Sequence, residues 1–444
     1  MTNFKFIEPT MRLVLGAALC CPVLACAQSA YVWTGTVSGD WNTAANWSPN
    51  GVPGGSAAQG GNPEDVAHFS ESTRTSITVS QSVELGAMSF AYGPVYSFQL
   101  NAFLQLRHGI LNLSTTTQNH FTVGPGTLWF EQDGDAANSS ITNNHVVEFG
   151  GSSTAGTADI NNTSGGITYF ADTSSAPLGL IGGGGTTDYS YATAPAAVGS
   201  LTGFPTAHIL LGSQTVSFGS LNSSSAFDGQ IMDGGFHGGT GGALTKVGSG
   251  ILQLTGNQSY TGKTTIQSGV LEVDGSLASP EVEIDTGTHL TGFGTVNNVA
   301  AQAGSFIDPG DIYNPHTPPK TALTIGRLIC AASPTVQERI GNVGGSTMGT
   351  YLILNSALQT GFCPHLHFRL SSANLPLQVD QYYLLMLIYG TTNYSPGNID
   401  FDFSYFPGYT QATGEILVSS LSSVSAIYLH LTNLGDTIFK NSFD

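Results

Sequence analysis

The chain has 444 residues, of which only 9% are charged, while glycine alone contributes 57. Ordinary soluble proteins carry about 25% charged residues, so this composition excludes a protein built from Glu-, Lys- and Arg-rich helices and favours many short strands joined by glycine turns. The formal net charge is −18, with 11 basic residues against 29 acidic ones, which excludes the basic surface that nucleic-acid binding needs.

Residues 1–27 have the layout of a secretory signal peptide. An apolar run from Leu13 to Leu24 follows Arg12, and segment 25–27 offers small side chains for cleavage. We therefore expect the mature chain to be exported. A lipoprotein acylated at Cys26 is the alternative, although Leu24 is bulkier than the residue usual two positions before such a cysteine. No later stretch reaches the roughly 20 apolar residues of a membrane-spanning helix, so we expect no integral membrane segment after signal removal.

Residues 28–70 are predicted to form an N-terminal cap rich in tryptophan. Three of the four tryptophans of the chain fall here, namely Trp33, Trp41 and Trp47. Two interpretations fit them: an aromatic shelf that binds sugar, or packed rings that close the open end of a stacked β structure. The second is favoured, because an uncovered terminal coil would leave its strand edges unpaired.

A near repeat of about twenty residues indicates stacked coils. Ile141 and Ile160 lie 19 residues apart, and Phe149 and Phe170 lie 21 apart. This period suits one coil made of three short strands and their turns, and stacking would place like side chains on one another at ~4.8 Å. We therefore predict an all-β fold with a parallel β-helix over residues 71–320. A flexible linker rich in Gly, Ser and Thr is the alternative.

The same region indicates where the coils turn and where they are interrupted. Asn143, Asn144, Asn161 and Asn162 fall where a coil must turn, and asparagine tolerates left-handed backbone and can stack into amide ladders. The stretch from Gly182 to Ser200 has little apolar periodicity, and we predict that it forms a loop protruding from the β-helix.

The most specific motif of the chain is LTKVGSGILQLTGNQSYTGKTTIQSGVLEV, residues 244–273. Aliphatic residues two positions apart would share one face of a strand, and glycines stand where strands pass into turns. The segment closely resembles the autotransporter-associated β-strand repeat of bacterial passenger domains. The resemblance implies a right-handed parallel β-helix and no catalytic residue within the motif. We assign the repeat core to Leu252, Leu254, Tyr260, Ile266, Leu271 and Val273.

Regions on both sides resemble parts of the same family. The tryptophan-rich start resembles the opening often found ahead of such repeats, and residues 290–296 and 308–310 resemble coils that end passenger helices. Residues 321–434 are rich in strand formers and are predicted to form terminal coils or a compact β cap. A translocator barrel would need roughly 250 residues, so we expect that this sequence lacks one. Residues 435–444 resemble a short sorting tail.

Cys330 and Cys363 are the two cysteines beyond the signal segment. In an oxidising compartment we expect them to form a disulfide, and two buried free thiols are the alternative. His365 and His367 would share a strand face with Cys363 and could complete a metal site. A disulfide would remove the sulfur ligand, and we predict neither a metal nor a cofactor.

Two groups of carboxylates could carry chemistry. Glu281, Glu283 and Asp285 alternate with apolar residues and would share one strand face, where they could bind calcium or act as acid and base. A solvated outer face is favoured, since half-burial produces the same alternation. Asp133 and Asp135 are best explained by a turn. We therefore predict no catalytic residue.

These features favour an exported, non-enzymatic surface or extracellular protein with a role in adhesion, matrix binding or display. The alternative is a carbohydrate-active enzyme, a polysaccharide lyase or hydrolase, on the same scaffold, which would need carboxylates converging on a groove. Candidate partners are surface glycans or other cell-surface proteins, and no nucleic acid. The expected location is secreted or on the outer-membrane surface, with the periplasm as the alternative.

Overall fold

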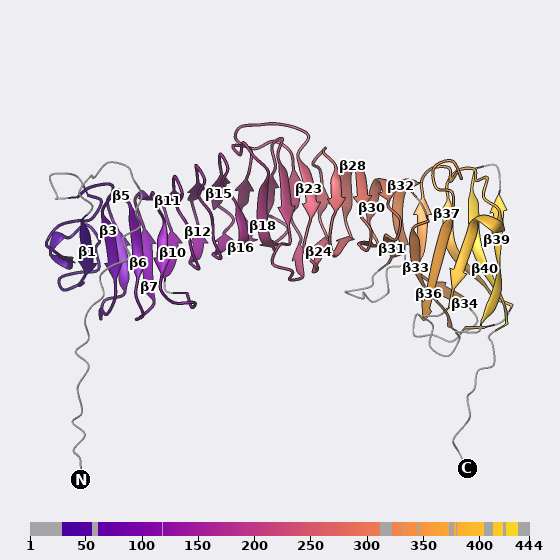
Figure 1. Cartoon of the computed structure of the whole chain (residues 1–444), viewed down its shortest axis with the longest axis horizontal. Helices are drawn as coiled ribbons and strands as arrows, with labels where there is room; N and C mark the ends of the chain where they lie inside the picture. Colours follow the sequence, from indigo (N-terminus) through magenta and orange to yellow (C-terminus); the bar gives the residue numbers. More distant parts are fainter. Residues whose placement is uncertain are drawn as a thin grey trace, which may run out of the picture.

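The computed structural model shows an elongated β-solenoid, with strand β1 (Ala30–Trp33) at one end and strands β39 (Thr413–Ser420) and β40 (Ser425–Asn433) at the other (Figure 1). The fold is all-β, with a parallel solenoid of about 12 turns, which confirms the predicted fold class. The predicted signal peptide and C-terminal tail lie outside the described residues. The described residues are 29–55, 61–117, 119–310, 322–331, 333–343, 346–372, 377–378, 380–403, 412–420 and 423–433.

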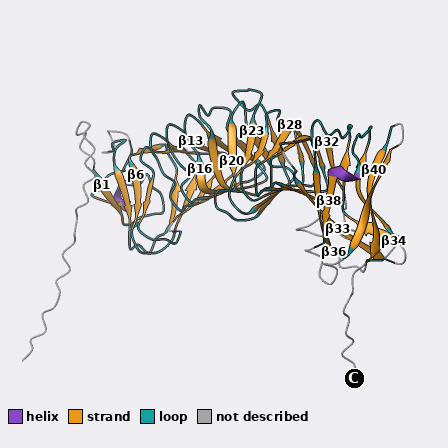
Figure 2. Ribbon diagram, turned by 45° about the vertical axis from the view of Figure 1, so that its right-hand side comes forward, coloured by secondary structure: helices purple, strands orange, loops and turns teal. Residues whose placement is uncertain are grey.

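Among the described residues, helix is limited to short 3-10 turns near the two ends of the solenoid (Figure 2). These are η1 (Ala44–Asn46) and η3 (Pro396–Asn398). All other regular structure among the described residues is strand, as the shortage of charged helix formers predicted.

One long sheet runs the length of the solenoid. Its strands pair in parallel from β4 to β37, and β40 and β39 then pair antiparallel. Its main strands, in spatial order, are β4 (Ser76–Val79), β7 (Tyr96–Leu100), β10 (Asn119–Val123), β12 (Ser140–Asn143), β14 (Asp159–Asn162), β16 (Ala176–Gly183), β18 (Ala196–Leu201), β20 (Thr215–Phe218), β23 (Ala243–Lys246), β26 (Thr264–Ile266), β28 (Ser276–Ile284), β30 (Thr295–Ala301), β32 (Ala322–Cys330), β35 (Tyr351–Leu354), β37 (Tyr382–Ile388), β40 (Ser425–Asn433) and β39 (Thr413–Ser420), with β25 (Asn257–Gln258) beside β28.

Three shorter sheets form the other sides of the solenoid. The N-terminal sheet contains β2 (Trp47–Ser48), β1 (Ala30–Trp33), β3 (Val66–Phe69), β6 (Ala87–Phe90) and β9 (Ile110–Asn112). The middle sheet contains β5 (Val83–Leu85), β8 (Leu104–Leu106), β11 (Thr127–Phe130), β13 (Val146–Phe149), β15 (Ile167–Phe170), β17 (Thr186–Asp188), β19 (His208–Leu210) and β22 (Gln230–Met232). The C-terminal sheet contains β21 (Ser225–Phe227), β24 (Ile251–Leu254), β27 (Val270–Val273), β29 (His289–Gly292), β31 (Phe306–Pro309), β33 (Thr335–Val343), β36 (Leu366–Ser372) and β38 (Ile399–Asp402), with β34 (Ser346–Gly349) antiparallel to β33.

The core consists of like side chains stacked along the solenoid axis. Phe130, Phe149, Phe170 and Tyr189 stack face to face, with ring centroids 4.9, 4.9 and 5.0 Å apart. Register between neighbouring strands sets this spacing, because each parallel strand lies about 4.8 Å from the next. All four rings are fully buried. The period of about twenty residues is thus one coil, as the near repeat predicted.

The turn between the long and middle sheets carries a buried polar ladder. The Asn143 side-chain amide donates to Asn162 Oδ1 at 2.9 Å, and the Asn162 amide donates to Thr187 Oγ1 at 3.1 Å. Thr168 Oγ1 also donates to Asn162 Oδ1, at 2.7 Å. These four side chains are nearly fully buried. Each coil therefore satisfies the polar groups of its neighbour, as a buried polar group requires.

The prediction of a protruding loop from Gly182 to Ser200 is wrong. The segment forms ordinary coils through β16, β17 and β18, with Ile181 in register with Leu201. Tyr189 and Val198 from this segment are buried in the core. The pattern was hidden because glycine and alanine fill many positions of these coils, and residues with little or no side chain give no hydrophobic period.

Parallel coils continue into the C-terminal region, where β32, β35 and β37 extend the long sheet. The antiparallel strands β40 and β39 then cover the last parallel strand of that sheet (Figure 1). Cys330, at the end of β32, forms a disulfide with Cys363, and their Cα atoms lie 4.5 Å apart. The bond closes a segment with a sequence separation of 33 residues.

Truncating one ring of the stack should destabilise the solenoid strongly. Phe149→Ala removes a ring held between Phe130 and Phe170, and such a cavity costs about 3 to 5 kcal/mol of unfolding free energy. Urea denaturation followed by circular dichroism measures the loss. Tyr92→Ala, at an exposed ring, is the control. Equal stability of the two variants would contradict the stacked core.

Removing the disulfide should also destabilise the chain. For a loop of this length, the chain-entropy model gives about 3 to 4 kcal/mol when both Cys330 and Cys363 are changed to Ala. Thermal unfolding with and without reductant measures the effect. Reductant should lower the melting temperature of the wild type and leave that of the double variant unchanged. If reductant left the melting temperature of the wild type unchanged, the disulfide would not form in solution.

Candidate functional site

The predicted tryptophan cap lies inside the molecule. Trp33, Trp41 and Trp47 are at most 3% exposed. The ring centroid of Trp47 lies 4.7 Å from that of Trp41 and 5.0 Å from that of Trp33. Each indole N–H donates to a backbone carbonyl oxygen. Phe69 of the next coil packs against two of the rings. These rings therefore end the core, and a sugar could not reach their faces.

The six residues assigned to the repeat core also lie in the interior. None of them is more than 1% exposed. Leu252 on β24 lies in register with Leu271 on β27, and Leu254 with Val273. The Tyr260 hydroxyl bonds to the Thr264 hydroxyl at 2.6 Å at the corner before β26. The segment thus consists of core and corner positions.

Lys246, the lysine of the Leu-Thr-Lys opening, occupies a core position that sequence reasoning missed. It lies in register between Phe218 and Ile266 and is 1% exposed. Its Nζ donates to the carbonyl oxygens of Val247, Gly248 and Ser268 at 2.7, 2.8 and 3.1 Å. Burial lowers the pKa of Lys246 to about 8. Its ammonium therefore ties two successive corners together within the core.

The acidic strand of β28 faces outward and is paired with a lysine. Lys263 Nζ lies 3.3 Å from Glu281 Oε1 and also contacts Glu283, which accepts from Gln302 at 3.1 Å. The hydrogen bond from Lys263 lowers the pKa of the Glu283 carboxyl, and the same bond raises the pKa of Lys263. Asp285, at the end of this strand, is partly exposed. This is the geometry of a solvated outer strand face.

Asp133 and Asp135 do not converge on a common point. Asp133 Oδ1 lies 2.6 Å from His108 Nδ1, and both side chains are exposed. Asp135 Oδ1 instead accepts from the Ala137 backbone N–H at 2.7 Å, which closes a turn. Burial raises the pKa of Asp135. The turn predicted for this segment is present, and it places the two acids apart.

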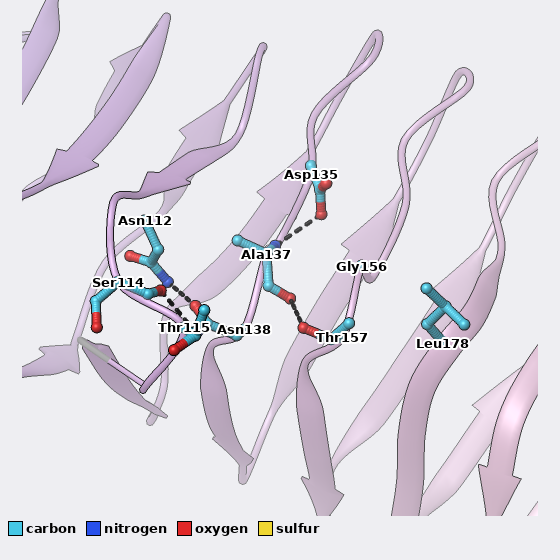
Figure 3. A pocket seen from close by; sticks show the side chains of 9 residues that line it. All are labelled: Asn112, Ser114, Thr115, Asp135, Ala137, Asn138, Gly156, Thr157 and Leu178. Atoms are coloured by element: carbon cyan, nitrogen blue, oxygen red, sulfur yellow. Dashed lines mark hydrogen bonds between the residues drawn. The ribbon is translucent and has the colours of Figure 1, made fainter. Parts of the chain in front are cut away.

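A shallow hollow of about 410 Å³ lies beside Asp135, where β9 is followed by short turns (Figure 3). Its lining includes Asn112, Ser114, Asp135, Asn138, Thr157 and Leu178. The side chains of Asn112 and Asn138 bond to each other, and Thr157 bonds to the Ala137 carbonyl oxygen at 3.3 Å. These internal bonds engage groups that a ligand would need, so the hollow has the character of a polar surface turn.

The side chains considered as metal ligands do not form a metal site. The Cys363 sulfur is in the disulfide, and His365 Nε2 lies 3.7 Å from Asp400 Oδ2. Across the described part of the chain, no three His, Cys, Asp or Glu side chains are placed to hold a metal ion.

A pair of a partly exposed histidine and a buried aspartate on the outer side of the C-terminal sheet was not found from the sequence. His289 Nδ1 lies 2.6 Å from Asp308 Oδ2, and Asp308 is 1% exposed. The His289 ring stacks on Phe306, with centroids 4.4 Å apart. Glu272, equally buried, lies in register one coil before Thr291, which is in register with Asp308. His289 and Asp308 lie 19 residues apart, which is one coil period. This spacing is the sequence signal that could have predicted their contact.

The match to known proteins falls on the repeat described above. Residues 244–273 match the family model Passenger-associated-transport-repeat. This segment is therefore a repeat of the autotransporter passenger type. That agreement confirms the resemblance inferred from the motif, and it covers the core and corner positions at Leu252, Tyr260 and Leu271.

Two relatives match part of the chain. The chain is 41% identical over 90 residues to an extracellular serine protease of Serratia marcescens, covering 20% of this chain and 8% of that protein. It is 33% identical over 119 residues to the adhesin BmaC autotransporter of Brucella suis biovar 1 (strain 1330), covering 26% of this chain and 3% of that protein. The chain thus spans less than a tenth of the length of either relative. In the described part of the molecule, no helix is long and apolar enough to cross a membrane.

Replacing Lys246 should show what its buried ammonium contributes. Lys246→Met leaves three carbonyl oxygens without their charged donor, and we expect a loss of about 2 to 4 kcal/mol of unfolding free energy at pH 7. Lys263→Met, at a more exposed lysine, is the control and should cost less than about 1 kcal/mol. Urea denaturation compares the two, and equal losses would contradict a special role for Lys246.

The difference in unfolding free energy between the wild type and Lys246→Met should also depend on pH. Since the pKa of Lys246 is about 8 in the folded chain and near 10.5 when unfolded, the folded state binds fewer protons between these values. Stability from this group therefore rises as pH increases from 8 toward 10, and Lys246→Met removes that rise. Urea denaturation at pH 7, 8, 9 and 9.5 measures it. Parallel pH profiles of wild type and variant would refute this assignment.

Proposed function

We propose that this chain is an exported β-helix of the passenger type that acts outside the cell or at its surface without catalysing a reaction. Its role would be adhesion, matrix binding or display. The observation that carries the proposal is that the residues of the passenger-type motif occupy core and corner positions. Successive coils extend one rigid core. Such a solenoid is suited to holding surfaces at fixed positions along an extended body.

The placement of the acidic residues supports a non-enzymatic role. A hydrolase or lyase on a β-helix needs carboxylates that face one another across an open groove. Here Glu281 and Glu283 are paired with Lys263 on an outer face, and Asp135 closes a backbone turn. These carboxylates stabilise local structure, which is a sufficient reason for their presence.

The relatives support a location and a class of role. One is named an extracellular protease and the other an adhesin autotransporter, so a place outside the cell is common to both names. We carry over the location; the adhesive role is proposed from the extended solenoid and agrees with the second name, with surface glycans or cell-surface proteins as partners. Protease activity is not carried over, because the matched segment is a small share of that relative.

One observation favours the alternative of a carbohydrate-active enzyme. The buried Asp308 pairs with the partly exposed His289, and Glu272 lies two coils away on the same column as Asp308. Two coils correspond to about 9.6 Å between strands, near the upper end of the separation at which two carboxyl groups can act as acid and base across a bond. This column is therefore the first place to test for catalysis.

The decisive experiment is a degradation screen on neutral and acidic polysaccharides with the wild type, Asp308→Asn and the control Asp285→Asn. We expect no new reducing ends and no ultraviolet absorbance of unsaturated products from any of the three. Activity above that of boiled protein would overturn the non-enzymatic proposal. Loss of that activity in Asp308→Asn alone would assign it to the His289 pair.

The adhesive role is tested separately with coated beads. Beads that carry the chain should bind immobilised cell-surface glycans or proteins more strongly than beads coated with an unrelated acidic protein. Equal binding of both kinds of bead would contradict an adhesive role, whatever the result of the degradation screen.

A further inference from the structure

Four aromatic rings form a partly exposed cluster on the outer side of the middle sheet. We call Tyr169, Tyr191, Phe236 and His237 the aromatic shelf. Ring centroids of Tyr169 lie 6.1 Å from Tyr191 and 5.8 Å from Phe236, and those of Tyr191 and His237 lie 5.2 Å apart. Phe236 is 72% exposed and Tyr191 41%. The rings contact one another yet leave much of their surface to solvent.

The chain uses buried polar groups to hold this shelf in place. Asp188 is fully buried, and its carboxylate accepts from the backbone N–H groups of Phe236 at 2.8 Å and Ser190 at 2.7 Å. Ser190 Oγ in turn accepts from the His237 N–H at 2.9 Å. The connection from β22 to β23 that carries both rings is thereby fixed to the sheet beneath it.

Glycine gives this connection its shape. Gly234, Gly235 and Gly238 have φ values of 82°, 114° and 72°, which side-chain-bearing residues rarely adopt. These glycines let the backbone of the connection take this course without strain. Together with the buried bonds of Asp188, they present Phe236 in a defined position. Holding a ring in place before contact lowers the entropy cost of binding.

Burial in the core does not explain the exposed rings. Phe236 contributes little to the core because nearly three quarters of its surface is in solvent. Exposed aromatic clusters of this kind mark interaction sites, where large rigid rings supply contact area. The shelf therefore has the properties of an interface that lacks its partner.

Charge identifies the kind of partner. Residues 108–245 contain nine Asp and Glu residues and no Lys or Arg, so about half of the net charge of −18 comes from this stretch. At its borders, Arg107 is ion-paired with Glu64, and Lys246 is buried in the core. The shelf lies within this stretch and has no lysine or arginine of its own to offer a negatively charged ligand.

A carboxylate stands directly beside the shelf. Glu148 lies in register with Tyr169, one coil away on the same outer column of the middle sheet. Burial and the negative charges of Asp172 and Glu131 raise the pKa of Glu148. A cation placed over the rings would be drawn to this carboxylate and would relieve the repulsion among the three acids.

We propose that the aromatic shelf is a docking surface for a basic segment of a partner protein, whose arginine or lysine side chains lie over Tyr191 and Phe236 and pair with Glu148. Guanidinium groups stack on aromatic faces and form ion pairs with carboxylates at the same time. The proposal rests on the proposed adhesive function and names its partner class. A neutral glycan would use the rings but would gain little from the surrounding negative charge.

The test uses isothermal titration calorimetry of the full chain with three probes. These are a synthetic peptide of alternating arginine and glycine, the same peptide with glutamate for arginine, and a neutral oligosaccharide. We expect binding of the arginine peptide alone, weakened by added salt. Phe236→Ala should weaken it about five- to ten-fold, and Glu148→Gln about three-fold, as expected for one cation–π contact and one partly exposed ion pair.

Matched controls separate this site from general attraction to an acidic protein. Phe204→Ala removes another exposed ring, and Asp159→Asn removes an exposed acid on the long sheet, so neither should change the affinity by more than about two-fold. Phe236→Tyr keeps the ring and should retain binding. Circular dichroism checks that each variant folds.

Two results would overturn the proposal. One is that the shelf variants behave like Phe204→Ala and Asp159→Asn, which would mean that the peptide binds by net charge alone. The other is binding of the oligosaccharide, but not of the arginine peptide, in a manner that depends on Phe236. Either failure leaves the non-enzymatic function standing, since the degradation screen decides that question independently.

Discussion

Register between parallel strands is the constraint on which the rest of this structure depends. Each strand of the long sheet pairs with the equivalent strand of the next coil, so every inward side chain has a counterpart about 4.8 Å away along the axis. Phenylalanine therefore stacks on phenylalanine from Phe130 to Phe170. Polar residues obey the same rule, since the Asn143 side-chain amide donates to Asn162 of the next coil. A coil is stable because of its neighbours, and the two ends must be closed.

The two ends meet this requirement in different ways. At the N-terminus, the packed rings of Trp33, Trp41 and Trp47 cover the core, and β2 pairs antiparallel with β1. At the other end, β40 and β39 pair antiparallel beyond β37 and cover the last coil of the long sheet. Antiparallel strands stop the stack because they present no further parallel edge in register with the coils.

Sequence alone predicted the fold where large side chains mark the period. Ile141 and Ile160, or Phe149 and Phe170, show the coil length directly, and the motif around Leu252 and Leu271 shows its corners. The prediction failed from Gly182 to Ser200 because small residues fill those coils and leave no pattern. It also missed Lys246, since a lysine in a strand is ordinarily assigned to solvent, and only the three corner carbonyls explain its burial.

The outer surface was less predictable from the sequence than the core, because outward positions do not follow the coil period. Inward positions repeat with the coil, but an outward cluster can join residues from different coils and from connections. Asp188 and Phe236 lie 48 residues apart in sequence, and no pattern in the sequence around either residue predicts the hydrogen bond between them. The two sides of the chain are thus under different constraints. Because the stacked interior already fixes the backbone of each coil, one connection can be lengthened without disturbing the coils around it. The connection from β22 to β23 can present exposed rings because its course is independent of the stacked core. The core supplies rigid support, and the outward residues can differ according to the partner.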